Sequence, residues 1–179
     1  IAGVVSIVTD ESGHKRLEVN NRFMMGSTQA AIAERRQAHL PLLIHPAPKQ
    51  ALFLGVGTGI TLGAAASYPD LEADGVELLP ELLDSLGEFS VWNRYPYNNA
   101  RIRLHRMDAR RFVKQTKTQY DVIVADVFHP ARDGAGLLYT REHFEQIKTR
   151  LSDSGIFCQW LPLHQFDQTG LGSLKATFQ

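Results

Sequence analysis

The most informative stretch of this 179-residue chain is residues 51–59, with the sequence ALFLGVGTG. Four apolar residues, typical of a buried strand, run directly into a turn with glycine at positions 55, 57 and 59. Glycine lets the backbone turn tightly and approach a ligand closely, and the helix predicted at 60–67 would present N–H donors at its amino terminus. Because residue 60 is Ile, this is not the GxGxxG dinucleotide fingerprint, and a plain structural turn is the alternative.

Strand and helix signals alternate downstream of this turn. Five short apolar or β-branched runs are predicted to be strands, at residues 51–54, 71–76, 102–105, 120–125 and 156–160. Helical patterns follow at residues 60–67, 80–89, 109–117, 140–151 and 171–178. This alternation predicts an α/β fold of the Rossmann-like kind, with a parallel, doubly wound sheet and helices on both faces.

The first 45 residues have a different pattern. Val4–Val8, Arg16–Val19 and Arg22–Met25 are predicted to be short strands joined by turn residues. Residues 29–44 are predicted to be a helix, which Pro41 should kink or end. We therefore expect a small N-terminal β-hairpin region with its helix at residues 1–45, and a nucleotide-binding domain at residues 46–179.

The composition excludes several classes of protein. Lys plus Arg and Asp plus Glu both total 19, so there is no electrostatic reason to expect a nucleic-acid or anionic-membrane partner. The single cysteine, Cys158, excludes an internal disulfide framework and indicates a reducing, cytoplasmic location. The seven histidines lack metal-ligand spacing, so no metal is predicted. The chain starts at Ile1, and we expect it to be part of a longer protein whose other segments could include membrane spans.

Two acids follow the second and third strands of the alternating region. Ligands bind beyond the carboxyl ends of the strands in an open parallel sheet. Glu77 lies about 20 residues after Gly55, the separation at which an acidic residue meets a ribose diol; the alternative is a solvated strand-end Glu. Asp108 could accept a hydrogen bond from an exocyclic amine such as that of adenine, or could simply cap the helix that follows it.

A third acid, Asp126, ends the fourth strand. A carboxylate at the mouth of an apolar strand is partly desolvated and is a better base for that reason. The alternative is an aspartate whose oxygens accept from loop N–H groups.

Together these positions resemble the spermidine synthase (polyamine aminopropyltransferase) family. The matching stretches are Ala51–Gly59, Gly75–Glu77, Arg106–Ala109, Tyr120–Asp126 with Pro130, Leu138–Thr140, and Asn20-Asn21 through Leu42. The resemblance implies an adenosyl-sulfonium cofactor, an amine substrate and a homodimer. It implies cofactor contacts from Gly55, Gly57, Thr58, Gly59, Glu77, Leu78, Asp108, Ala109, Asp126 and Pro130. Within that set Glu77 would hold the ribose, Asp108 and Ala109 the adenine, and Asp126 would be the catalytic carboxylate; His129 and Tyr139 would lie at the substrate. The family fold continues into two further strands that this chain lacks.

The sequence departs from the family at both halves of the site. Thr58 replaces an aspartate thought to repel the carboxylate of S-adenosylmethionine. The cofactor could therefore be decarboxylated S-adenosylmethionine, yielding methylthioadenosine, or S-adenosylmethionine itself, yielding S-adenosylhomocysteine. His129 replaces a second aspartate of the family, and Met24 and Ala33 replace a Gln and a Tyr that contact the polyamine. The residues that bind putrescine in the family are therefore missing from this sequence.

Three functions are compatible with this pattern. The first is an aminopropyltransferase with Asp126 as the base. The second is a methyltransferase that uses S-adenosylmethionine in the same pocket. The third is a non-catalytic adenosyl-ligand-binding domain of a larger, membrane-fused protein.

Overall fold

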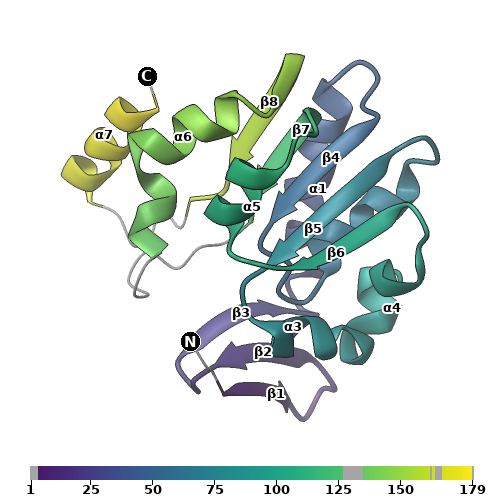
Figure 1. Cartoon of the computed structure of the whole chain (residues 1–179). Coiled ribbons are helices and arrows are strands. Elements are labelled where there is room, and N and C mark those ends of the chain that lie inside the picture. Colours follow the sequence, from purple (N-terminus) through teal and green to yellow (C-terminus); the bar gives the residue numbers. More distant parts are fainter. Residues whose placement is uncertain (1–3, 127–134, 162, 164–166, 179) are drawn as a thin grey trace.

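The computed structural model describes residues 4–126, 135–161, 163 and 167–178 (Figure 1). Its N-terminal part is a three-stranded antiparallel sheet in the order β1-β2-β3. These strands are β1 (Val5–Thr9), β2 (Lys15–Val19) and β3 (Phe23–Ser27). The predicted hairpin region is thus confirmed. Leu17 and Val19 are completely buried and pack with Leu79, Leu82 and Phe89, which attaches the small sheet to the rest of the molecule.

The main sheet has five strands, all parallel, in the order β6-β5-β4-β7-β8. They are β4 (Gln50–Leu54), β5 (Glu72–Glu77), β6 (Ile102–Arg106), β7 (Tyr120–Ala125) and β8 (Leu151–Gln159). The chain adds β5 and β6 on one side of β4, then β7 and β8 on the other. The predicted Rossmann-like fold is confirmed, and strand order reverses between β4 and β7.

Helices cover both faces of this sheet (Figure 1). The α-helices are α1 (Ala31–Ile44), α2 (Ile60–Gly63), α3 (Pro80–Asp84), α4 (Ser90–Asn93), α5 (Ala109–Gln115), α6 (Arg141–Lys148) and α7 (Gln168–Thr177). Short 3-10 helices are η1 (Ala64–Ser67), η2 (Leu86–Phe89), η3 (Pro96–Asn98) and η4 (Ala135–Tyr139). Where one helix was predicted at 80–89, α3 ends at Asp84 and η2 follows. The Ser85 hydroxyl donates to the carbonyl of Leu82 at 2.8 Å, and such local bonding weakens a helix interior.

The helix predicted at residues 29–44 is confirmed as α1, which continues through Pro41 and ends at Ile44. The start of the last strand was predicted wrongly, because β8 begins at Leu151, where a helix was predicted to end, and not at residue 156. Gly155 therefore lies inside this strand. The β7–β8 pairing changes register between Tyr120 and Val122, so the extra residues form an irregularity within the strand. A Cβ on Gly155 would lie 2.9 Å from the carbonyl oxygen of Tyr120, which explains the glycine.

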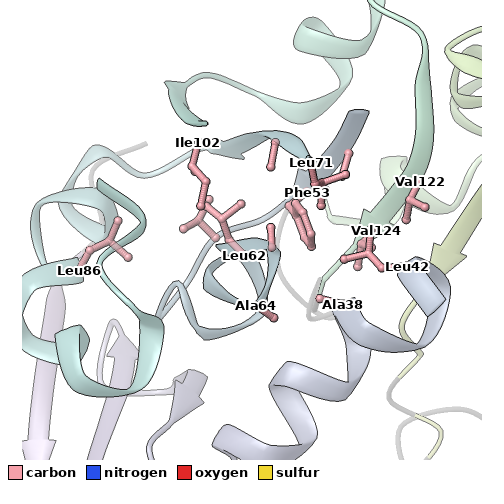
Figure 2. Packing of buried hydrophobic residues seen from close by; sticks show 14 of the residues in the cluster. Ala38, Leu42, Phe53, Leu62, Ala64, Leu71, Leu86, Ile102, Val122 and Val124 are labelled. Carbon is pink, nitrogen blue, oxygen red and sulfur yellow. The ribbon is translucent and has the colours of Figure 1, made fainter. Parts of the chain in front are cut away.

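The core lies on both faces of the sheet. On one face Phe53 and Val124 pack with Leu62 of α2 and with Leu42 of α1 (Figure 2). On the other face Leu52, Leu54 and Ile123 pack with Phe112 and Val113 of α5 and Ile147 of α6. Each fully buried side chain of this size contributes about 1.5–3 kcal/mol relative to exposure. This burial holds the strand ends, and therefore the site, in place.

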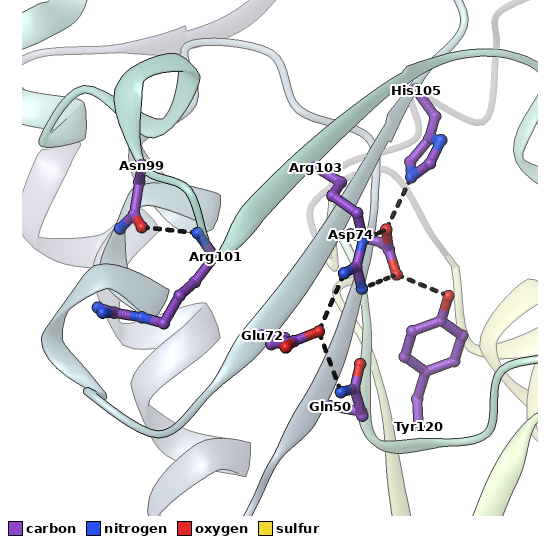
Figure 3. Close-up of polar contacts among 8 residues, drawn as sticks. All are labelled: Gln50, Glu72, Asp74, Asn99, Arg101, Arg103, His105 and Tyr120. Atoms are coloured by element: carbon purple, nitrogen blue, oxygen red, sulfur yellow. Dashed lines mark hydrogen bonds and ion pairs between the residues drawn. The ribbon is translucent and has the colours of Figure 1, made fainter.

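A buried polar cluster joins three strands at mid-sheet (Figure 3). Asp74 on β5 is 4% exposed and accepts from Arg103 Nε at 2.9 Å, while His105 Nε2 lies 2.7 Å from the same carboxylate. The hydroxyl of Tyr120 on β7 donates to Asp74 at 3.0 Å. Burial by itself would raise the pKa of Asp74, but the hydrogen bonds from Arg103, His105 and Tyr120 outweigh it, and the pKa is lowered.

Replacing Asp74 with asparagine is expected to lower the free energy of unfolding at pH 7 by about 2 kcal/mol, because the hydrogen bonds from Arg103 and His105 to this buried carboxylate are weakened or lost. A lowered folded-state pKa adds stability above the unfolded-state pKa of about 3.9, and this stability is lost as pH falls through the folded-state pKa. Urea unfolding at pH 7 and pH 4 should therefore show less pH dependence in D74N than in the wild type. Asp70, whose side chain is 77% exposed in its pair with Lys49, is the control, and an equal loss in D70N would contradict the prediction.

Candidate functional site

The carboxyl ends of four strands meet at one edge of the sheet. The N–H of Gly55 donates to the carbonyl of Val76 at 2.9 Å, and the N–H of Asp126 donates to that of Leu54 at 3.0 Å. The N–H of Met107 donates to the carbonyl of Glu77 at 2.9 Å. The glycine turn, Glu77, Asp108 and Asp126 therefore lie along the same edge, around the point where strand order reverses. Ligands bind at this point in open α/β sheets.

The glycine turn fits tightly against the N-terminal sheet. Gly55, Gly57 and Gly59 have φ angles of 91°, 52° and 76°, a region that side chains disfavour. A Cβ on Gly57 would also lie 2.8 Å from the carbonyl oxygen of Met25 on β3. The turn therefore requires glycine here for two reasons, its backbone conformation and the close approach of β3.

The carboxylate of Glu77 accepts hydrogen bonds from the backbone of this turn. Its Oε2 accepts from the N–H groups of Val56 at 3.0 Å and Gly57 at 3.3 Å, and its Oε1 accepts from Leu79 N–H at 3.0 Å. The residue is 5% exposed. A carboxylate offers about four acceptor positions, so these three bonds leave room for one more hydrogen bond, to Oε1. Glu77 is thus a structural clamp of the turn as well as a candidate ribose contact.

Thr58 does not point out of the turn. It is 2% exposed, and its hydroxyl donates to Oε2 of Glu34 on α1 at 2.6 Å. Glu34 also accepts from Ser27 N–H at 2.9 Å, and burial raises the pKa of its carboxyl. The sequence analysis considered only that a neutral Thr58 would not repel a cofactor carboxylate. The structure adds that the Glu34 carboxyl group lies directly against Thr58.

Asp108 caps helix α5. Its Oδ1 accepts from the N–H of Arg111 at 3.0 Å, which confirms the capping alternative, and its side chain keeps 35% exposure. Ala109, the first residue of α5, is buried, whereas the apolar Leu78 beside Glu77 is 45% exposed. Oδ1 of Asp108 thus serves the helix, and Oδ2 lies 3.4 Å from the guanidinium of Arg110. The carboxylate remains partly exposed at the same edge as Leu78.

A cleft of about 900 Å³ lies between α5 and α6, with Asp108 and His143 on its walls. His143 is 5% exposed, and its Nε2 has no hydrogen-bond partner among the described residues. Burial lowers the pKa of His143 to about 4, so the ring is neutral at pH 7. No pattern in the sequence marks this histidine as a candidate site residue.

Asp126 is half-buried between α1 and β8. The side-chain amide of Gln37, with its nitrogen facing Asp126, donates to Oδ1, and the amide oxygen accepts from the indole N–H of Trp160 at 3.0 Å. Cys158 lies nearby on β8; burial, and then the charge of Asp126, raise the pKa of its thiol. Asp126 therefore accepts a hydrogen bond from the side chain of Gln37 on α1. The sequence analysis had considered only loop N–H groups as its partners.

Of the remaining predicted site residues, only some belong to the part of the chain that the structure describes. His129 and Pro130 lie outside the described residues. Tyr139 ends η4 and is half-buried, and burial raises the pKa of its hydroxyl to about 12, so it stays protonated at neutral pH. Met24 is 56% exposed and Ala33 is exposed, which leaves both on the surface of the described structure.

Besides His143, the sequence analysis missed the side chains of Glu34, Gln37 and Trp160, which lie beside Thr58 or Asp126. Glu34 and Gln37 are three residues apart and lie toward the inner face of α1, beside buried Ala38. Polar residues on an inward-facing helical stripe are a usable signal, because buried polar groups require partners. Trp160 gave no signal of this kind.

In the part of the chain that the structure describes, no group of three His, Cys, Asp or Glu side chains could hold a metal ion. Within the same residues, every helix is too short or too polar to cross a membrane.

Comparisons with known proteins agree with the predicted fold and with the family resemblance. The family model for the spermine/spermidine synthase domain matches residues 31–164. A polyamine aminopropyltransferase from Methanocaldococcus jannaschii is 26% identical over 166 residues, covering 91% of this chain and 56% of that protein. The spermidine synthase of Dictyostelium discoideum is 30% identical over 131 residues, covering 70% of this chain and 46% of that protein. This chain thus spans about half the length of these relatives.

Solved structures give the same fold. Spermidine synthase from Thermotoga maritima superposes with a TM-score of 0.80 at 19% identity, covering 98% of this chain and 58% of that one. A human methyltransferase-like protein 13 in complex with SAH superposes with a TM-score of 0.53 at 17% identity, covering 84% of this chain and 89% of that one. The match to the family model extends over well over half of the chain, and the chain belongs to the spermine/spermidine synthase family.

Proposed function

We propose that this chain is the adenosyl-binding part of a transferase that moves an aminopropyl group from decarboxylated S-adenosylmethionine to an amine. The observation that carries the proposal is the meeting of the glycine turn, Glu77, Asp108 and Asp126 at one sheet edge. Its relatives named above are polyamine aminopropyltransferases and spermidine synthases. One solved spermidine synthase with a TM-score of 0.79 is described as a complex with the transition-state analogue AdoDATO.

The described residues fit an adenosine. Glu77 has room for one ribose hydroxyl at Oε1, and a second could be accepted at Oε2 by releasing the 3.3 Å bond from Gly57. Leu78 offers an exposed apolar side chain to the flat face of a base. The partly exposed carboxylate of Asp108 can accept from the adenine amino group.

Asp126 is proposed to act as the base. The sulfonium supplies an activated methylene carbon and leaves as a neutral thioether, methylthioadenosine. The amine nitrogen forms the new C–N bond as the C–S bond breaks, and the electron pair of that bond stays on sulfur. An alkyl amine with a pKa of about 10 is protonated at pH 7, so it must lose one proton before it can attack, and the alkylated product remains an ammonium at this pH. The Asp126 carboxylate orients the amine and accepts the proton that the amine loses before attack.

Methyl transfer from S-adenosylmethionine is the second candidate. Thr58 favours it at the sequence level, and the similar methyltransferase-like protein was solved with SAH. The carboxyl group of Glu34 behind Thr58 weighs against it, because a cofactor carboxylate near this turn would meet a second acid. Homodimerisation, a cytoplasmic location, membrane segments elsewhere in the protein and a purely ligand-binding role remain predictions of the sequence.

The deciding experiment measures binding and turnover with the same preparation. Calorimetry should show tighter binding of decarboxylated S-adenosylmethionine than of S-adenosylmethionine, and methylthioadenosine should form with at least one member of a panel of di- and polyamines. Binding without product from any amine would support the ligand-binding role. Binding only S-adenosylmethionine would support the methyltransferase instead.

Replacing Asp108 with asparagine tests the adenine contact without loss of the helix cap, because Asn and Asp cap helices equally well. If the Asn oxygen keeps its bond to Arg111 N–H, the NH₂ group faces the adenine amino group, and two donors meet. We expect methylthioadenosine affinity to fall roughly 10–100-fold, the penalty of an unpaired buried donor. Methylthioinosine, which has an acceptor oxygen at that position, should lose much less affinity.

Calorimetry with both ligands measures this change in preference, and urea unfolding should show a stability within about 0.5 kcal/mol of the wild type. A matched control is D153N, which neutralises an exposed carboxylate on β8 away from the α5 cap. Equal losses for both ligands in D108N would argue against a hydrogen bond to the adenine amino group.

A further inference from the structure

Three side chains from distant parts of the sequence form a continuous hydrogen-bonded chain that ends at Asp126. The indole N–H of Trp160 donates to the amide oxygen of Gln37 at 3.0 Å, and the amide nitrogen of Gln37 donates to Oδ1 of Asp126. All three residues are half-buried. Neither Gln37 nor Trp160 is needed for the proton transfer proposed above, so their arrangement requires its own explanation.

The fold brings these residues together. Asp126 follows β7 and Trp160 follows β8, and the N–H of Trp160 donates to the carbonyl of Ala125 at 3.1 Å. Helix α1 contacts both strands from one face of the sheet. Gln37 therefore reaches the ends of two adjacent parallel strands at once. Asp126 and Trp160 are fixed by the sheet, and Gln37 is fixed by the packing of α1.

The chemistry of the groups sets the direction of the chain. An indole N–H can only donate, and an ionised carboxylate can only accept. A side chain that connects them must accept at one end and donate at the other, which an amide does and a carboxylate or ammonium does not. Because Trp160 fixes the amide oxygen, the amide nitrogen is directed at Asp126. Hydrogen bonds of this kind to an ionised acceptor are stronger than neutral ones.

We propose that Gln37 is a positioning residue for Asp126, oriented in turn by Trp160. The inference rests on the proposed function only for its kinetic consequence. Gln37 holds one carboxylate oxygen at a fixed place, so that the carboxylate presents a defined direction to the incoming amine. It also favours the ionised form of Asp126, which is the form able to accept a proton.

The first test follows Trp160 without any turnover. The chain has two tryptophans, so its ¹H–¹⁵N spectrum has two indole signals, and W160F assigns them. In the wild type we expect the Trp160 indole signal to shift as pH falls and Asp126 becomes protonated. The shift should disappear in D126N and in Q37L. The proposal would be overturned if the chemical shift of the Trp160 indole did not depend on pH in the wild type. It would also be overturned if the pH dependence were the same in Q37L as in the wild type.

Cys158 is a titratable side chain close to Asp126, and burial and the charge of Asp126 raise the pKa of its thiol. The same pH titration in C158A should therefore match the wild type. If the pH-dependent shift of the Trp160 indole signal disappeared in C158A, the signal would report on the thiol. That result would contradict the proposed hydrogen-bonded chain from Trp160 through Gln37 to Asp126. This measurement stands even if no amine is ever turned over, so its outcome is separate from that of the proposed function.

The second test uses kinetics. Q37L should lower kcat about tenfold, the value of one hydrogen bond of about 1.4 kcal/mol to a charged group, and leave KM for the sulfonium cofactor within about twofold. The acidic limb of its pH–rate profile should move to higher pH, because the ionised carboxylate loses a donor. Q37E should move the limb further, since two carboxylates then face each other. W160F should have a smaller effect in the same direction.

The matched control is R36L, on the adjacent and exposed position of α1. It makes the same change from a long polar side chain to leucine and should leave kcat and the pH profile unchanged. A merely structural role for Gln37 predicts that Q37L lowers stability with no movement of the acidic limb. That result would reject the positioning role.

Discussion

The Asp126→Asn variant is expected to lose about 10³-fold in kcat at pH 7, within the range that general bases contribute. Asparagine keeps the shape of the side chain but cannot accept the proton of the attacking amine. Cofactor affinity should change little, because the groups proposed to hold the adenosine are Glu77, Leu78 and Asp108. Methylthioadenosine release under saturating cofactor and amine measures kcat directly.

The pH dependence of the residual activity distinguishes loss of a base from misfolding. Solvent deprotonates more of the amine as pH rises toward its pKa of about 10, so the D126N rate should rise about tenfold per pH unit between pH 7 and 9. The wild-type rate should rise less over the same interval. Asp153, exposed on β8, supplies the control D153N, which should remain within twofold of the wild type. Activity of D126N within threefold of the wild type would exclude Asp126 as the base.

Replacing Gly63 with alanine is expected to lower the free energy of unfolding by about 3 kcal/mol or more, an overpacking effect. A Cβ at this last residue of α2 would lie 1.7 Å from the carbonyl oxygen of Asn93, a separation that forces α4 to move. Backbone strain plays no part, since the φ of Gly63 is −62°. Asn93 is completely buried, and its amide donates to the carbonyls of Thr58 at 3.0 Å and Leu86 at 2.8 Å. Displacing α4 should therefore also weaken ligand binding at the turn that contains Thr58.

Urea unfolding and methylthioadenosine calorimetry measure both effects. Gly87 in η2 provides the control, because a Cβ there meets nothing within 4 Å. The free energy of unfolding of G87A should be unchanged or higher by up to about 1 kcal/mol, since alanine lowers the conformational entropy of the unfolded chain. Alanine has the higher helix propensity at either position, so a stable G63A protein would show that α2 and α4 are not in close contact.

The order of elements in the Rossmann-like domain could be predicted from sequence because strands and helices differ in length and period. The glycine turn and the three acids also stood out, since each follows an apolar strand directly. Element ends were less predictable. Strand β8 starts at Leu151 because its pairing with β7 tolerates an irregularity at Ser154-Gly155, and only the neighbouring strand decides this.

The partners of the candidate site residues could not be predicted. Glu77 was expected to face a ribose, yet it mainly accepts from backbone N–H groups whose directions depend on the folded turn. Gln37 and Trp160 are far apart in sequence and meet only because α1 crosses the ends of β7 and β8. Contacts of this kind depend on tertiary packing, which local sequence patterns do not predict.

Pro41 has a mechanical consequence for the helix that carries Gln37. Proline has no N–H, so the main-chain carbonyl of Gln37 receives no hydrogen bond from the residue four positions later. The helical turn around Gln37 therefore has one main-chain hydrogen bond fewer than its neighbours. The placement of the Gln37 side chain depends correspondingly more on its contacts with Trp160 and Asp126 and on the packing of α1.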